Sequence, residues 1–225
     1  MQLFLTSFTV QWSELIIQDV SVLDQLRKVL RSKKWDTIYV QQDAVRYCVQ
    51  INDRDNTSVS TTITDTIAAP KNMWLDVVLY VALPNKWDKA ELIAQKATEI
   101  WVSRLIFWRA ERSVLREVNP NKVLRIQKIM QEAVEQSWGW TLPELSFVTD
   151  MDWTVSDHVV VFDIADTDLV SSTSWKSIGV IGPEGWLTPA DYAHFPHHIV
   201  SSLGNTILRM ETAAIVWSWV LKNPL

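Results

Sequence analysis

The chain of 225 residues is 48% hydrophobic and 21% charged, which is typical of an ordinary soluble globular protein with one large or two small domains. Its net charge of −5 argues against a protein that coats nucleic acid non-specifically, and the lone cysteine, Cys48, excludes an internal disulfide. No apolar run approaches the roughly 20 residues that span a bilayer, and the N-terminus lacks the basic region of a signal peptide, so we expect a cytoplasmic protein.

Residues 1–69 read as short β-strands around one helix. The β-rich stretches are 3–8, 15–18, 37–41, 46–51 and 58–63, and the helical stretch is 20–30. This pattern predicts a small β-barrel or sheet, followed by a linker at 68–72. Basic residues in and after the helix form either a solvated helix face or a set of phosphate contacts: Arg27, Lys28, Arg31, Lys33 and Lys34.

From residue 73 onward, strands and helices alternate. A continuous apolar run at 75–83 is typical of a strand buried on both faces, and further strands are expected at 102–107, 145–148, 158–162, 178–181 and 199–203. Helices are expected from Asp88, which with Glu91 forms a capping box, from Asn119, and at 189–194 and 210–221. The alternation predicts an α/β domain at 73–225 with a mainly parallel sheet, whose ligands bind beyond the carboxyl ends of the strands.

Two loops between a strand and a helix are candidates for chemistry. The first, 181–188, contains Gly182 and Gly185, which permit either close approach of a ligand to the backbone or a tight turn. The second, 203–213, contains Arg209 and Glu211, which either form a weak surface ion pair or orient a substrate. The sequence has no P-loop, GxGxxG fingerprint or GxSxG elbow, and no metal-ligand spacing, so no metal site is predicted.

Five segments follow one another along the chain: QKATE at 95–99, ERS at 111–113, EAVEQS at 132–137, IGPEG at 181–185, and LG through ILRMETA at 203–213. In this order they resemble the SPOUT class of RNA methyltransferases, and more narrowly the RsmE-type enzymes that methylate N3 of a uridine in 16S ribosomal RNA. Residues 26–36 resemble, more weakly, the PUA-like RNA-binding domain of that family.

The resemblance implies a trefoil-knotted α/β methyltransferase domain preceded by a PUA-like β-barrel domain. It also implies a homodimer that acts on the small ribosomal subunit with S-adenosylmethionine as cofactor. The implied cofactor-binding residues are Ile181, Gly182, Pro183, Glu184, Gly185, Leu203, Gly204, Ile207, Leu208, Thr212 and Ala213.

Methyl transfer to uridine N3 requires removal of the imide proton and stabilisation of charge on the pyrimidine oxygens. Arg112 and Arg209 are the candidate cations. Glu99, Glu111 and Glu211 are the candidate bases or orienting groups, although Glu99 also suits a salt bridge on the helix surface. Phosphate contacts are expected from the 27–34 segment and from Arg109, Arg112, Arg116, Lys122 and Arg125. Two alternatives stay open: a SPOUT enzyme for a ribose 2′-hydroxyl or a transfer RNA, and an RNA-binding assembly protein without catalysis.

The composition also holds an anomaly: 13 Trp and only 5 Gly. An average protein of this length has about 16 Gly. Trp101 and Trp138 directly follow helical patterns, where the left-handed residue is usually glycine. Trp35, Trp87 and Trp186 also fall where the family pattern has glycine. Either the gene comes from an organism that reads UGA as glycine, with UGA rendered here as Trp, or genuine tryptophans are tolerated at relaxed turns.

Overall fold

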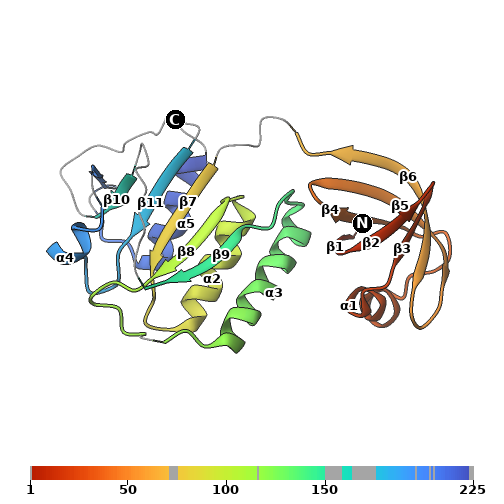
Figure 1. The fold of residues 1–225 in the computed structure, drawn as a ribbon, viewed down its shortest axis with the longest axis horizontal. Helices are drawn as coiled ribbons and strands as arrows, with labels where there is room; N and C mark the ends of the chain where they lie inside the picture. The colour runs from red at the N-terminus through yellow and green to blue at the C-terminus, as the bar shows by residue number, and fades with distance from the viewer. Residues whose placement is uncertain are drawn as a thin grey trace. The chain divides into compact units, whose positions relative to one another are not determined.

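The computed structural model describes residues 2–70, 76–115, 117–149, 159–163, 176–195, 197–202, 204 and 206–222. The chain divides into two compact units. The first comprises Met1–Met73 with Val134–Thr141, and the second comprises Trp74–Ala133 with Leu142–Leu225. Figure 1 shows that the first unit is mainly β and that the second combines a sheet with helices.

A six-stranded sheet forms the first unit, in the order β1-β4-β5-β6-β3-β2. Its neighbouring strands are antiparallel except for the parallel pair β1 and β4. Buried apolar side chains such as Phe4, Leu15 and Val40 form its core. The strands are β1 (Leu3–Leu5), β2 (Phe8–Gln11), β3 (Glu14–Ile17), β4 (Thr37–Gln42), β5 (Val45–Arg54) and β6 (Val59–Ala68).

The expected helix of the first unit is present in two parts, the α-helix α1 (Val20–Asp24) and the π-helix η1 (Gln25–Val29). The Asp19 side chain caps α1 by accepting hydrogen bonds from the backbone N–H groups of Ser21 and Val22. Such a cap satisfies donors that have no partner within the helix.

Arg46 joins the segment Val134–Thr141 to the strands of the first unit. Its buried guanidinium donates to Gln41 Oε1 at 2.8 Å and to the carbonyls of Trp138 and Gly139 at 3.1 and 3.2 Å. The rings of Trp138 and Trp140 lie 4.9 and 4.0 Å from it. These contacts satisfy a cation that would otherwise be costly to bury.

The second unit contains a six-stranded sheet in the order β12-β10-β11-β7-β8-β9, in which every neighbouring pair is parallel. Its central strands are strongly apolar, as expected for strands covered on both faces. The chain runs outward from β7 to β9 and then builds the other half beside β7, so a ligand site is expected at the carboxyl ends near this reversal. The strands are β7 (Asp76–Ala82), β8 (Arg104–Trp108), β9 (Glu144–Val148), β10 (Val159–Phe162), β11 (Lys176–Ile181) and β12 (Ile199–Ser201).

Among the described residues, the helices that accompany this sheet are α2 (Trp87–Glu99), α3 (Pro120–Ser137), α4 (Pro189–Tyr192) and α5 (Met210–Lys222). Helix α5 packs against α2, β7 and β11. Trp217 of α5 is fully buried over Gly179, where a Cβ atom would lie 2.3 Å from the indole Nε1. Gly179 is therefore required by the packing of α5.

The expected fold class, an α/β unit with a parallel sheet preceded by a β-rich unit, is confirmed. The Asn119 cap of α3 is also confirmed, because its Oδ1 accepts from the N–H of Asn121 at 2.9 Å. The capping box at Asp88 is wrong. Helix α2 begins one residue earlier, at Trp87, with Lys86 as N-cap and no side-chain cap bond. Glu91 instead pairs with Arg125 at 2.8 Å.

Candidate functional site

A cavity of about 700 Å³ lies at the carboxyl ends of β10, β11 and β12, bordered also by the first turn of α2. This volume is within the range of small-molecule sites. Eight of the expected cofactor-binding residues line it: Ile181, Gly182, Pro183, Glu184, Gly204, Ile207, Leu208 and Ala213. Gly185 and Thr212 are next to lining residues but do not line it, and Leu203 lies outside the described residues.

Two glycines shape the cavity wall. A Cβ at Gly182 would lie 2.8 Å from Leu187 Cγ, and Gly204 has a φ of +111°, which side chains rarely adopt. Both positions therefore favour glycine, and the absence of a side chain leaves room for a ligand beside the backbone. The cavity has a mixed apolar and charged lining, which fits a compact amphipathic cofactor.

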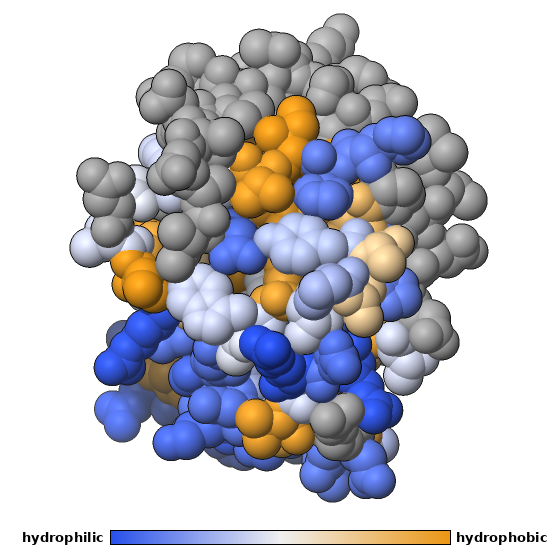
Figure 2. Space-filling model, turned by 90° about the vertical axis from the view of Figure 1, so that its left-hand side faces the viewer, coloured by the Kyte–Doolittle hydropathy of each residue, from blue (hydrophilic) through white to orange (hydrophobic). Residues whose placement is uncertain are grey.

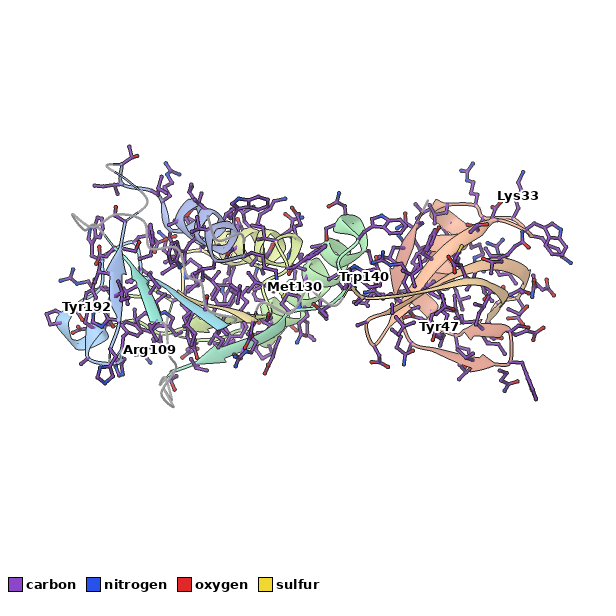
Figure 3. All side chains as sticks on the ribbon, turned by 90° about the horizontal axis from the view of Figure 1, so that it is seen from above. Lys33, Tyr47, Arg109, Met130, Trp140 and Tyr192 are labelled. Atoms are coloured by element: carbon purple, nitrogen blue, oxygen red, sulfur yellow. The ribbon has the colours of Figure 1, made fainter. Side chains whose placement is uncertain are left out.

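Four lining residues outside the two candidate loops were missed by sequence reasoning: Lys89, Phe162, Asp163 and Ser202. Trp186, Leu187, Thr206 and Met210 also line the cavity, and they lie within the loops 181–188 and 203–213 that the sequence singled out. Asp163 directly follows β10, so the rule that ligands bind at strand ends points to it. Its Oδ2 accepts from the Tyr192 hydroxyl at 2.6 Å. Burial and this carboxylate together raise the pKa of Tyr192 far above its usual value, so the phenol keeps its proton and holds Asp163 in place. Figure 3 marks Tyr192, on α4.

A charged cluster borders the same cavity. Lys89 Nζ lies 2.7 Å from Glu184 Oε1 and 3.7 Å from Glu211 Oε2, and the Asn85 N–H also donates to Glu184. The bond to Glu184 raises the pKa of Lys89 despite partial desolvation. Burial favours a higher pKa for Glu184, but the hydrogen bonds from Lys89 and from backbone N–H groups outweigh it and lower that pKa. Arg209 lines the cavity beside this cluster, whereas Glu211 does not line it and pairs with Lys89.

Glu111 and Arg112 lie against the loop that follows β11. Arg112 Nη1 donates to the Gly185 carbonyl at 2.7 Å, and the Thr188 hydroxyl donates to Glu111 Oε2 at 2.5 Å. A Cβ at Gly185 would lie 3.3 Å from Arg112 Cβ, so glycine permits this close approach. The structure thus brings two distant expected motifs together, although neither Glu111 nor Arg112 lines the cavity itself.

Glu99 is not brought to the cavity. It lies near the end of α2, ten residues and therefore about 15 Å beyond Lys89. Its carboxylate pairs with Lys96 at 2.8 Å, which matches the alternative interpretation of a salt bridge on the helix surface.

The expected RNA-binding residues fall in both units. In the first unit, Arg27 and Lys28 pair with Asp24, whereas Arg31, Lys33 and Lys34 are exposed, and Figure 3 shows Lys33 pointing away from the sheet. In the second unit, Arg109 is exposed, and Lys122 and Arg125 share Glu91. Arg116 lies outside the described residues.

Figure 2 shows the end of the second unit that carries α4, where apolar side chains gather near the middle and hydrophilic ones predominate below. The part of the chain that the structure describes contains no group of three His, Cys, Asp or Glu side chains placed to hold a metal ion. Within the same residues, every helix is too short or too polar to cross a membrane.

Known proteins with similar sequences support this picture. A family model described as RNA methyltransferase domain matches residues 71–222. The ribosomal RNA small subunit methyltransferase E of Bacillus subtilis is 31% identical over 64% of this chain and 65% of its own length, slightly under two thirds. The ribosomal RNA small subunit methyltransferase E 2 of Borreliella burgdorferi is 24% identical over 89% of this chain and 88% of its own length.

A solved structure shares the fold. The Neisseria gonorrhoeae ribosomal RNA small subunit methyltransferase E, bound to S-adenosyl methionine, superposes with a TM-score of 0.82 at 19% identity, covering 97% of this chain and 95% of that one. The resemblance to RsmE-type enzymes is confirmed by these matches. The chain belongs to the family of RNA methyltransferase domains.

Proposed function

We propose that this protein is an S-adenosylmethionine-dependent enzyme that methylates N3 of a uridine in small-subunit (16S) ribosomal RNA. The observation that carries the proposal is the glycine-walled cavity at the carboxyl ends of β10, β11 and β12, in a chain of the RNA methyltransferase family. The names of the relatives support ribosomal RNA as the substrate. The choice of uridine N3 rests on the sequence resemblance to RsmE-type enzymes.

The cavity residues suit the parts of this cofactor. Ile181, Leu208 and Ala213 offer apolar surface to its uncharged parts, and the carboxylates of Asp163 and Glu184 suit its positive charges. When bound, S-adenosylmethionine supplies a methyl group made electrophilic by the attached sulfonium. No metal is needed for such a transfer.

The residues around the cavity would act on the uridine. A carboxylate, Glu111 or Glu211, would accept the N3 proton, which frees the nitrogen electron pair for bonding to the methyl group that the cofactor would supply. Arg112 and Arg209 stabilise the negative charge that develops on the pyrimidine oxygens. Binding must also hold nitrogen, carbon and sulfur in line.

The test has two parts. Calorimetric titration with S-adenosylmethionine measures cofactor binding, and incubation of unmethylated small subunits with labelled cofactor, followed by nucleoside analysis, identifies the product. We expect binding and N3-methyluridine. A methylated ribose or transfer RNA would instead indicate another SPOUT reaction, and RNA binding by folded protein without cofactor binding would indicate an assembly protein.

A further inference from the structure

Asp191 of α4 is a buried carboxylate, only 3% exposed, that the proposed chemistry does not use. Its Oδ1 accepts from the Glu111 N–H and its Oδ2 accepts from the Thr188 N–H, both at 2.9 Å. A buried carboxylate is costly unless such bonds satisfy it. Asp191 therefore stabilises one particular placement of the backbone at Glu111.

Three contacts link Glu111 and Arg112 to the 185–191 segment. Besides the Asp191 bond to Glu111 N–H, the Thr188 hydroxyl donates to Glu111 Oε2, and Arg112 donates to the Gly185 carbonyl. The Thr188 hydroxyl also lies 3.1 Å from Asp191 Oδ2, so its single proton is within reach of two carboxylates. The side chain of Glu111 and the backbone that carries Arg112 are thus fixed by the same small network.

We propose that Asp191 is a positioning residue that aligns Glu111 and Arg112 with the 181–188 loop. This inference rests on the proposed function. Asp191 touches neither the cavity nor the reacting atoms, so its removal should lower kcat more than it weakens cofactor binding.

The test is a double-mutant cycle between Asp191→Asn and Arg112→Ala, with Glu111→Gln as a second partner. We expect Asp191→Asn to lower kcat at least tenfold while the Kd for S-adenosylmethionine changes less than twofold and the protein stays folded in thermal melts. Asp191→Asn should lower kcat much less when Arg112→Ala or Glu111→Gln is already present, because the group that Asp191 aligns is then missing. Asp19→Asn is the matched control, since Asp19 also accepts from backbone N–H groups but lies in the first unit.

Unchanged kcat in folded Asp191→Asn, or an equal loss in all three backgrounds, would overturn the positioning role. Failure of the proposed function looks different, because the unsubstituted protein would then bind no cofactor or produce no methylated uridine.

A second, independent observation concerns five tryptophans. Among the described residues, nine residues other than glycine have a positive φ, and five of them are Trp: Trp12, Trp35, Trp101, Trp138 and Trp186, with φ between 56° and 76°. The Cβ of an L-residue crowds the following carbonyl in this conformation, so glycine is the usual occupant. A bulky aromatic residue is an improbable choice at one such position and far more so at five.

The positions of these tryptophans in the fold are also ones that glycine usually occupies. Trp101 and Trp138 follow the last turns of α2 and α3, where a left-handed glycine commonly ends a helix. Trp12 is the first residue of the two-residue loop between β2 and β3, and a positive φ there matches a type II′ turn, which takes glycine. Trp12 is also fully exposed, so its ring contributes no packing.

Other tryptophans lie in the core with an ordinary backbone conformation. Trp108 and Trp217 are buried without a positive φ, and their rings lie 5.6 Å from Phe195 and 5.2 Å from Phe162. Trp87 begins α2 without a positive φ, so the backbone gives no reason for glycine there. Two of the left-handed tryptophans have ring contacts: Trp138 with Tyr39 and Arg46, and Trp35 with Lys34.

We infer that positions 12, 35, 101, 138 and 186 are glycine in the protein that the cell makes, through a code that reads UGA as glycine. The gene should then carry TGA at all five positions, and peptides of the native protein should show glycine there by mass spectrometry. A TGG codon or a tryptophan residue at any of the five would refute the assignment of that position, and at all five would overturn the inference.

Expression of both sequences provides a physical test. A variant with glycine at the five positions should unfold at a higher temperature than the printed sequence. Trp219→Gly is the control: this side chain is 59% exposed within α5, where glycine weakens a helix, so its melting temperature should fall. A lower melting temperature for the five-glycine variant would contradict the inference.

Discussion

At the residue scale, the absence of a side chain at Gly182 allows the backbone there to pack closely against Leu187 of the same loop. A methyl group there would meet Leu187 Cγ at 2.8 Å, and overpacking of this kind typically costs about 1–3 kcal/mol. We expect Gly182→Ala to weaken S-adenosylmethionine binding about tenfold, or about 1.4 kcal/mol, by calorimetric titration. Addition of Leu187→Ala should recover part of the affinity. Unchanged binding by Gly182→Ala would show that the loop shifts to accommodate the methyl group without loss of affinity.

The ion pair between Lys89 and Glu184 makes a pH-dependent contribution to stability. The pKa of Glu184 is lowered in the folded protein from an ordinary value of 4.5, so its contribution is present above pH 4.5 and is lost as the pH falls through the lower folded value. We expect Glu184→Gln to reduce the free energy of unfolding at pH 7 by up to about 1 kcal/mol, since the pair is partly solvated. Urea unfolding from pH 7 downward should show the difference between the two proteins narrowing below pH 4.5, and a difference that does not narrow below pH 4.5 would exclude the ion pair as its source.

At the element scale, α1 depends on its cap because the helix has only five residues before η1. Asp19 accepts from Ser21 and Val22, and removal of such a cap typically costs about 1 kcal/mol. We expect Asp19→Ala to destabilise the protein by about that amount and Asp19→Asn to cost only a few tenths, because asparagine also caps well. Urea unfolding of both variants tests this, and equal losses would show that the carboxylate charge matters more than the cap.

Element types were predictable where apolar periodicity is strong, as in the buried run of β7 and the amphipathic pattern of α3. The start of α2 was not predictable. Asp88 has a side chain that commonly caps helices, but the N-cap position in the structure is Lys86. The π-helical half of the first helix also carries no simple sequence signal. Loop motifs pointed to the cavity. Lys89, in the first turn of α2, and Asp163, directly after β10, belong to no such motif and were missed, although the strand-end rule points to Asp163.

At the scale of the whole molecule, the candidate cofactor cavity belongs to the second unit, whereas the exposed basic residues Arg31, Lys33 and Lys34 belong to the first. A protein with a net charge of −5 repels RNA over much of its surface, so local basic groups must supply the attraction. Cofactor binding and RNA binding should therefore respond to different substitutions. This separation is testable because neither Lys33 nor Lys34 lies at the cavity.

We expect Lys33→Ala with Lys34→Ala to weaken binding to ribosomal RNA and to leave the Kd for S-adenosylmethionine unchanged. If each lysine neutralises one phosphate, the slope of log K against log salt should fall by about 1.4, at about 0.7 per contact with single-stranded RNA. Arg27→Ala with Lys28→Ala is the matched control, and it should have a smaller effect because Asp24 already pairs with both side chains. Filter binding across a salt series measures the slope, and an unchanged slope in Lys33→Ala with Lys34→Ala would contradict a role for these lysines in RNA binding.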